Sequence, residues 1–157
     1  MENKCVYCGS EVEIEREHVI PAVYYTLRSF DPTQQWIVPA CRTCNSLAGS
    51  NLYFSIPEKA IYIAKRYKIR FKKIIGIPYW SEEELRGLGY ILRKGIEESM
   101  MMRLVVLRRI QHIESVTEYT RDYLRPKWVE EEYKKYRLDL LKKRKAKKPT
   151  STSDSRA

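Results

Sequence analysis

Residues 5–8 read Cys-Val-Tyr-Cys, and residues 41–46 read Cys-Arg-Thr-Cys-Asn-Ser. In each cysteine pair two residues separate the sulfurs, so a short turn can present both of them to one metal ion. Two such pairs make up the four-thiolate set that Zn²⁺ favours in structural sites. We therefore predict that one structural zinc ion is bound by Cys5, Cys8, Cys41 and Cys44.

The other use of four cysteines is a pair of disulfide bonds in a secreted domain. The chain begins Met1-Glu2-Asn3-Lys4, and no apolar segment of a secretory signal follows. No apolar run approaches the roughly 20 residues that cross a bilayer. We therefore expect a cytoplasmic, intracellular protein that does not bind membranes and that carries its cysteines as zinc ligands.

Charge is distributed unevenly along the 157 residues, whose formal net charge is +10. Residues 1–60 hold five Lys/Arg against seven Asp/Glu, a net charge of −2, so the remainder carries +12. A basic protein of this kind is expected to bind a polyanion such as nucleic acid. The acidic first part suits divalent cations, and affinity for phosphates should come from the later residues.

The first 56 residues read as short strands and turns. Val6-Tyr7 and the alternating residues 11–15 predict a short hairpin with Gly9-Ser10 as its turn. Asn45 is a candidate cap for a short helix that ends at Gly49. We therefore predict an α+β fold whose first segment, residues 1–56, is a small zinc-stapled module.

Helical patterns begin at Pro57 and continue to residue 141. Ile61, Ala64 and Ile69 form a stripe on a basic helix that ends before Gly76. Residues 81–84 read Ser-Glu-Glu-Glu, a capping box that should begin a long helical stretch toward residue 113, with glycines at 87, 89 and 95 as candidate interruptions. Residues 100–107 are apolar on more than one face, which is typical of a central, core-forming helix. Residues 57–141 are thus a helical basic extension, and residues 142–157 a disordered, Lys-rich tail.

Glu17 and His18 stand between the two cysteine pairs, in the segment Glu17-His18-Val19-Ile20-Pro21. A histidine can act as a general base, because its ordinary pKa lies near neutrality. A neighbouring carboxylate suggests that a cation is held beside it. The pair is therefore a candidate for hydrolytic chemistry, although a lone histidine beside a glutamate is more often structural.

These segments together resemble the HNH endonucleases, in particular the zinc-clipped form. In that form a Cys-x-x-Cys precedes an acidic-His-Ile-x-Pro segment and a Cys-x-x-Cys-Asn follows it, as residues 5–8, 17–21 and 41–45 do here. The stretch from residue 36 to 49 also looks like that of small phage-encoded HNH proteins. The resemblance covers roughly residues 5–50.

The resemblance implies a ββα-metal fold with the zinc set apart from the catalytic ion. His18 would be the general base that activates water for attack on a phosphodiester. Glu17 and Asn45 would bind one catalytic Mg²⁺ or Mn²⁺ through oxygen atoms, which hard cations prefer. That ion would stabilise the charge on the scissile phosphate and the leaving 3′ oxygen.

One position departs from the family pattern. The middle Asn of the motif, nine residues before Asn45, falls on Trp36. In the family this Asn braces the loop of the catalytic histidine, whereas an indole donates one hydrogen bond and accepts none. Gln34 or Gln35 could supply the brace from a shifted position.

Candidate phosphate contacts are basic residues in three places. Arg42 lies within the second cysteine pair, a basic aromatic run follows Pro57, and the tail is rich in lysine. An ordinary helix with a solvated basic face explains the run equally well. The predicted nucleic-acid contacts are Arg42, Arg66, Lys68, Arg70, Lys72, Lys73, Lys142, Lys143, Arg144 and Lys145.

We therefore predict a metal-dependent HNH endonuclease that cleaves DNA, as a monomer or a homodimer. A second hypothesis is a zinc-dependent nucleic-acid-binding protein with a degenerate HNH site, marked by Trp36. A third is a zinc-stapled protein-interaction module, which would show no salt-sensitive binding to DNA.

Overall fold

The computed structural model describes residues 4–28, 31, 33–116 and 125–146. The chain divides into two compact units, Met1–Leu124 and Arg125–Ala157. The described part of the first unit contains a two-stranded antiparallel sheet followed by a mostly helical remainder. This arrangement confirms the predicted α+β class. The predicted boundary after residue 56 falls within the first unit.

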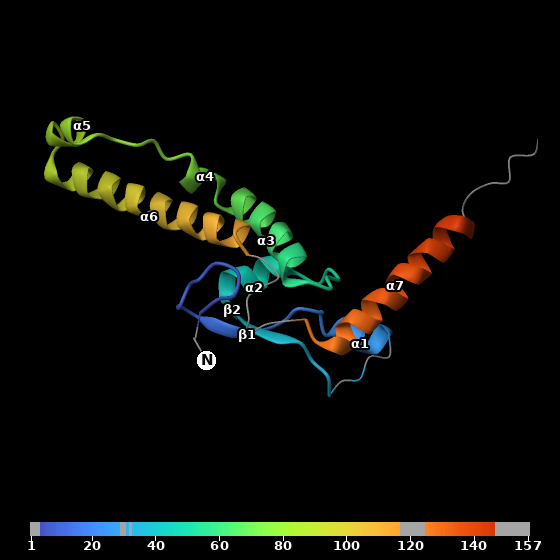
Figure 1. Cartoon of the computed structure of the whole chain (residues 1–157). Coiled ribbons are helices and arrows are strands. Elements are labelled where there is room, and N and C mark those ends of the chain that lie inside the picture. The colour runs from blue at the N-terminus through green and yellow to red at the C-terminus, as the bar shows by residue number, and fades with distance from the viewer. Residues whose placement is uncertain (1–3, 29–30, 32, 117–124, 147–157) are drawn as a thin grey trace, which may run out of the picture. The chain divides into compact units, whose positions relative to one another are not determined.

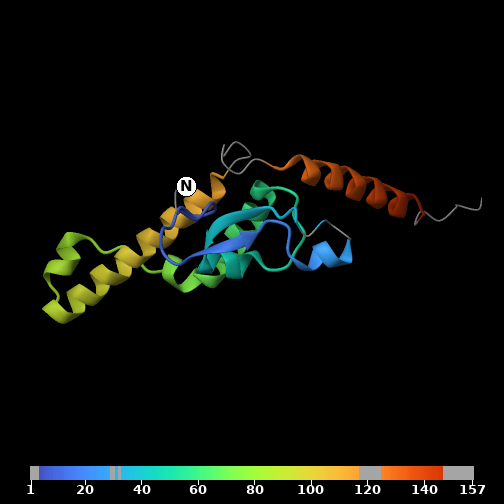
Figure 2. The same ribbon diagram turned by 90° about the horizontal axis from the view of Figure 1, so that it is seen from below.

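Strand β1 (Ile14–His18) pairs with strand β2 (Ile37–Cys41), and Figure 2 shows the two side by side. Helix α1 (Val23–Leu27) lies between them in the chain. The predicted hairpin of residues 6–7 with 11–15 is wrong. Its first part folds into a tight turn in which Gly9 donates to the Cys5 carbonyl (2.9 Å), and the strand begins only after Glu13, which has a positive φ of 51°.

Helix α2 (Arg42–Ala48) follows β2 directly and ends at Gly49, as predicted. Its start differs from the prediction, because the Cys41 sulfur and not Asn45 caps the helix by accepting a hydrogen bond from the Cys44 amide. Asn45 is therefore an interior residue of α2. Its side chain does not cap the helix and projects from it.

Helix α3 (Ile56–Arg70) is capped by Ser55, whose hydroxyl accepts from the Glu58 amide. It packs mainly against α2 and α6, and its buried face comprises Ile56, Lys59, Ala60, Ile63, Ala64 and Tyr67. The predicted apolar stripe is wrong at two positions, because Ile61 and Ile69 are 72% and 61% exposed. The true stripe follows the same spacing but includes a lysine.

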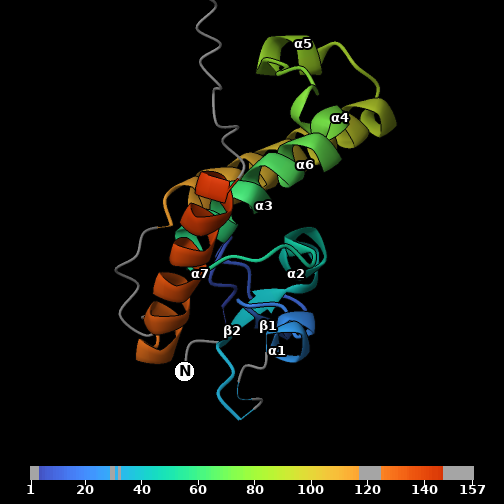
Figure 3. The same cartoon turned by 90° about the vertical axis from the view of Figure 1, so that its right-hand side faces the viewer.

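Helix α3 is followed by α4 (Lys72–Ile75), α5 (Glu82–Arg86) and α6 (Tyr90–Glu114). The predicted capping box at Ser81 and Glu84 is confirmed, and the predicted interruption of the long helix falls between α5 and α6. Helix α6 returns beside α3 toward the two-stranded sheet, and α5 lies at the end of α6 that is remote from the sheet (Figures 1 and 3).

The prediction that residues 100–107 form the core is wrong for most of them. Met101, Met102 and Leu104 are 62%, 54% and 54% exposed. The buried residues of α6 are Val106, Ile110 and Ile113, and the helices that pack against α6 are chiefly α3 and α4.

Helix α7 (Lys127–Ala146) belongs to the second unit. It extends past the predicted end at Leu141 and contains residues 142–146 of the predicted disordered tail. Lysine and arginine are good helix formers and are favoured near a helix C-terminus, which accounts for the extension. Residues 147–157 of that tail lie outside the described residues. Among the described helices, none has the length and apolar character of a membrane span.

Gly9 is a position where a side chain should be costly. Its φ is +70°, and a Cβ atom there would lie 3.2 Å from the His112 ring of α6. We expect Gly9→Ala to lower the free energy of unfolding by about 1–2 kcal/mol, measured by urea denaturation. In a His112→Ala background the loss should be smaller, because only the backbone strain remains. An equal loss in both backgrounds would show that the ring contact is not part of the cost.

Candidate functional site

The four cysteines meet at one buried point of the first unit. Cys5 and Cys8 come from the first turn, Cys41 ends β2, and Cys44 lies in α2. All four sulfurs are within 4.8 Å of one another, and Cys8 Sγ lies 3.6 Å from Cys41 Sγ. All four are free thiols. The disulfide alternative is thus not the arrangement found.

The sulfur positions fit a zinc ion. A Zn–S bond of about 2.3 Å places tetrahedral sulfurs about 3.8 Å apart, close to the separation found between Cys8 and Cys41. The pKa of Cys41 lies well below its usual value, because the thiols of Cys44, Cys5 and Cys8 can donate to its sulfur. The pKa values of Cys8 and Cys44 are raised, in each case first by the hydrogen bond with Cys41, so zinc binding would release protons from these thiols. The cluster could therefore hold a structural zinc ion, as the spacing predicts.

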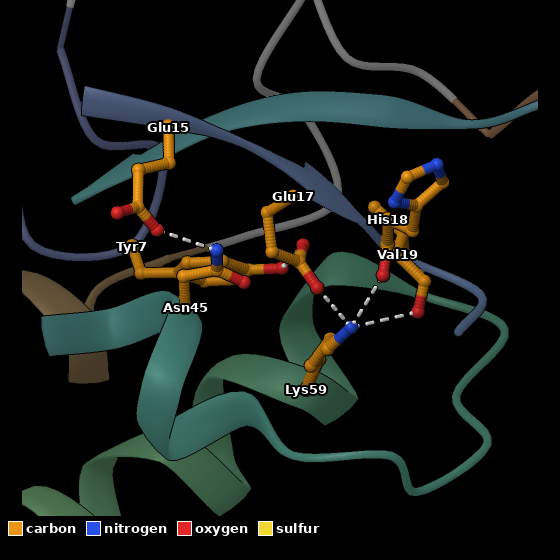
Figure 4. Close-up of polar contacts among 7 residues, drawn as sticks. All are labelled: Tyr7, Glu15, Glu17, His18, Val19, Asn45 and Lys59. Atoms are coloured by element: carbon orange, nitrogen blue, oxygen red, sulfur yellow. Dashed lines mark hydrogen bonds and ion pairs between the residues drawn. The ribbon is translucent and has the colours of Figure 1, made fainter. Parts of the chain in front are cut away.

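Glu17 lies on β1 with its side chain turned to α2 and α3, and the residue is only 3% exposed (Figure 4). The Tyr7 hydroxyl donates to one carboxylate oxygen at 2.8 Å, and the Lys59 ammonium pairs with the other. Tyr7 lies between Cys5 and Cys8, so the first cysteine turn is linked directly to this carboxylate. Burial, and next the charge of Glu17, raise the pKa of Tyr7 well above its usual value.

Lys59 is fully buried and has three hydrogen-bond partners, as many as an ammonium has protons. Besides Glu17 it donates to the carbonyl oxygens of His18 at 2.7 Å and Val19 at 2.9 Å (Figure 4). Burial lowers the pKa of Lys59, and the nearby carboxylate of Glu17 opposes that shift. The ammonium thus acts as an internal cation that binds three successive residues.

Asn45 projects from α2 toward β1, where its amide nitrogen donates to Glu15 at 2.8 Å. A carboxylate only accepts hydrogen bonds, so the contact fixes which end of the Asn45 amide is nitrogen. The bonds from Asn45 and then from Arg42 lower the pKa of Glu15. The Asn45 oxygen has no hydrogen-bond partner among the described residues and is available to a cation.

His18 ends β1, opposite Ile37 of β2, and is half-buried. Its ring points away from the Glu17 carboxylate and from Asn45 (Figure 4). Nε2 lies 3.1 Å from the side-chain oxygen of Gln35. Gln35 is one of the two glutamines proposed to brace the histidine, and it contacts the ring itself. The Trp36 carbonyl accepts from the Val19 amide at 3.0 Å.

The three predicted site residues therefore lie on one β-β-α unit but contact different partners. Glu17 faces Lys59, Asn45 faces Glu15, and the His18 ring faces Gln35. Beyond the cysteine cluster, no group of three metal-binding side chains is found among the described residues. Sequence reasoning missed Tyr7, Glu15 and Lys59. For Lys59 a signal existed, since it falls on the spacing of Ile56, Ala60 and Ile63.

The predicted phosphate contacts differ in whether an acidic residue pairs with them. Arg42 is paired with Glu13 and Glu15, and Lys68 with Glu114. Arg66, Lys72 and Lys73 are exposed and have no acidic partner within the described part of the chain. Residues 142–145 lie in the last turns of α7. In the first unit, the predicted contacts without an acidic partner therefore lie in the segment from Arg66 to Lys73.

Comparison with known proteins found no matching family model, no matching curated protein and no matching solved structure. Function must therefore be argued from the geometry of the site and from the motifs.

Proposed function

We propose that this chain is a zinc-stapled, metal-dependent endonuclease of the HNH type that hydrolyses phosphodiester bonds in DNA. The contact between His18 and Gln35 carries the proposal. With the Gln35 amide oxygen turned to the ring, Nε2 of His18 would be the donor, and Nδ1 would then keep its lone pair. A general base needs such a lone pair and a group that fixes the other nitrogen.

In the proposed reaction, Nδ1 of His18 takes a proton from water. The water oxygen forms a bond to phosphorus while the bond from phosphorus to the 3′ oxygen breaks. The leaving 3′ oxygen takes up a proton from solvent, and His18 later returns its own proton to solvent. Gln35 keeps the ring in the required tautomer throughout.

Glu17 and Asn45 are the residues that would hold Mg²⁺ or Mn²⁺. The Asn45 oxygen suits a hard cation and is free, whereas two of the roughly four acceptor positions of the Glu17 carboxylate are already used. When bound, the ion would neutralise charge on the scissile phosphate and on the leaving oxygen. Asn45 is thus the better prepared of the two ligands.

The decisive experiment is cleavage of supercoiled plasmid by the zinc-loaded protein with Mg²⁺, with Mn²⁺ and with EDTA. We expect open-circular or linear DNA only with added Mg²⁺ or Mn²⁺, and loss of about 10²–10⁴-fold in rate for His18→Ala. His112→Ala is the matched control, since these are the two histidines of the chain. Cleavage that persists in His18→Ala would refute the assigned base.

A second candidate is a zinc-stapled DNA-binding protein without catalysis. The specific observation in its favour is that Glu17 already has a cation, the buried ammonium of Lys59. In the same experiment it predicts a shifted plasmid that stays supercoiled with every metal. That outcome would replace the nuclease proposal.

Both candidates require phosphate contacts, and the basic segment from Arg66 to Lys73 is the surface we assign to them. We expect Arg66→Gln and Lys72→Gln each to weaken DNA binding at low salt and to reduce the salt dependence by about one counterion. Fluorescence anisotropy at several salt concentrations measures both effects. Lys4→Gln, which removes the same charge from a residue paired with Glu11, should leave them unchanged. Binding that does not depend on salt would favour the protein-interaction module.

A further inference from the structure

We infer that Lys59 is a positioning residue for His18, an inference that rests on the proposed function. Lys59 lies on α3, outside the segment that carries the motif, and its ammonium reaches back to residues 17–19. It donates to the His18 carbonyl at 2.7 Å and to the Val19 carbonyl at 2.9 Å, and it pairs with Glu17. Each of three successive residues thus gives it one oxygen.

These contacts hold the backbone on both sides of the His18 Cα atom. On one side the Glu17 carboxylate is fixed by Lys59 and Tyr7. On the other, the peptide group between His18 and Val19 is held at both ends. Its carbonyl accepts from Lys59, and its N–H donates to the Trp36 carbonyl at 3.0 Å. The direction of the His18 side chain is therefore set by α3 together with Trp36, the residue that precedes β2.

Lys59 acts through His18 and not on a substrate. It is fully buried, and all three of its protons are used, so a phosphodiester cannot reach the ammonium. Helix α3 packs against α2, which follows β2 directly, and this packing fixes the base of the lysine side chain. Gln35 contacts the His18 ring at Nε2. Lys59 thus supports the backbone of His18, and Gln35 favours one tautomer of its ring.

The test compares Glu17→Gln with the double variant Glu17→Gln/Lys59→Met. Both lack the Glu17 charge, so the double variant does not leave a buried carboxylate unpaired, and only it lacks the support of the two carbonyls. We expect the Val19 amide to exchange at least about tenfold faster in the double variant than in the single one. Nitrogen-15 shifts of the His18 ring should change from one tautomer to a mixture. The amide of Ile110, in the core of α6, serves as the internal reference.

These readouts need no DNA, so they remain valid whether or not the protein is a nuclease. Equal Val19 exchange and an unchanged tautomer in the two proteins would overturn the inference. Should the double variant unfold, Lys59→Arg replaces it, because a planar guanidinium keeps the charge but not the arrangement of three donors. Its Val19 amide should again exchange faster, and unchanged exchange would overturn the inference.

Discussion

Cys44→Ser is expected to abolish zinc binding and to unfold the two-stranded sheet and α2. Structural zinc sites contribute on the order of 10 kcal/mol of apparent binding free energy, which is folding free energy when no site exists in the unfolded chain. The two-stranded sheet is too small to be stable alone. The four cysteines of the cluster come from the first turn, β2 and α2, so the loss of one ligand disconnects these three parts of the fold. Zinc content by native mass spectrometry and unfolding followed by circular dichroism measure the effect.

Reducing agent and chelator separate the zinc site from a disulfide. We expect dithiothreitol alone to leave the fold intact, and dithiothreitol with a strong zinc chelator to unfold it. Acidification should also release zinc, because the thiolate ligands take up protons. For Cys44→Ser, the matched control is Thr43→Ser, which alters the neighbouring residue and no sulfur. A chelated protein with an unchanged unfolding curve would contradict a structural zinc site.

Local signals in the sequence predicted the cysteine cluster and several helix ends correctly. The cysteine spacing identified all four residues of a cluster that could hold zinc, because two short turns suffice to define such a site. Gly49 ends α2 and Ser81 begins α5, since a positive φ and a capping box are encoded by one to four residues.

Features that depend on distant parts of the chain could not be predicted in this way. The pairing of β1 with β2 joins residues 19 to 27 positions apart, and nothing local in residues 11–15 reveals it. The exposure of Met101 and Met102 depends on which neighbours cover α6. An apolar sequence shows which faces can be buried, and the number of packing partners decides which of them are.

The candidate site likewise combines residues that local motifs predicted with partners that lie far away in the sequence. Motif spacing singled out Glu17, His18 and Asn45, but their partners lie elsewhere in the sequence. Lys59 is separated from Glu17 by 42 positions, and its role follows from α3 packing on α2. A lysine on an apolar stripe must find acceptors for its ammonium when it is buried. That rule alone predicts a buried partner for Lys59, although not which carboxylate it is.

Lys59→Met is expected to lower the free energy of unfolding by about 3–5 kcal/mol, because it leaves the buried Glu17 charge without its partner. Lys65→Met, which changes an exposed lysine on the same helix, should cost no more than about 0.5 kcal/mol. Urea unfolding of both variants provides the measurement. A loss at Lys59 no larger than that at Lys65 would mean that the ion pair contributes nothing to stability.

A double-mutant cycle with Glu17→Gln gives the coupling energy of the pair, and that energy bears on function. If the double variant recovers about 3 kcal/mol relative to the sum of the single losses, Glu17 favours Lys59 strongly over solvent. A divalent ion that had to displace the ammonium would then bind about a hundredfold more weakly, since each 1.4 kcal/mol is a factor of ten. Lys59→Met should in that case bind Mn²⁺ more tightly than the wild type. Weaker Mn²⁺ binding in Lys59→Met would instead show that Glu17 must be held by the lysine to serve as a ligand.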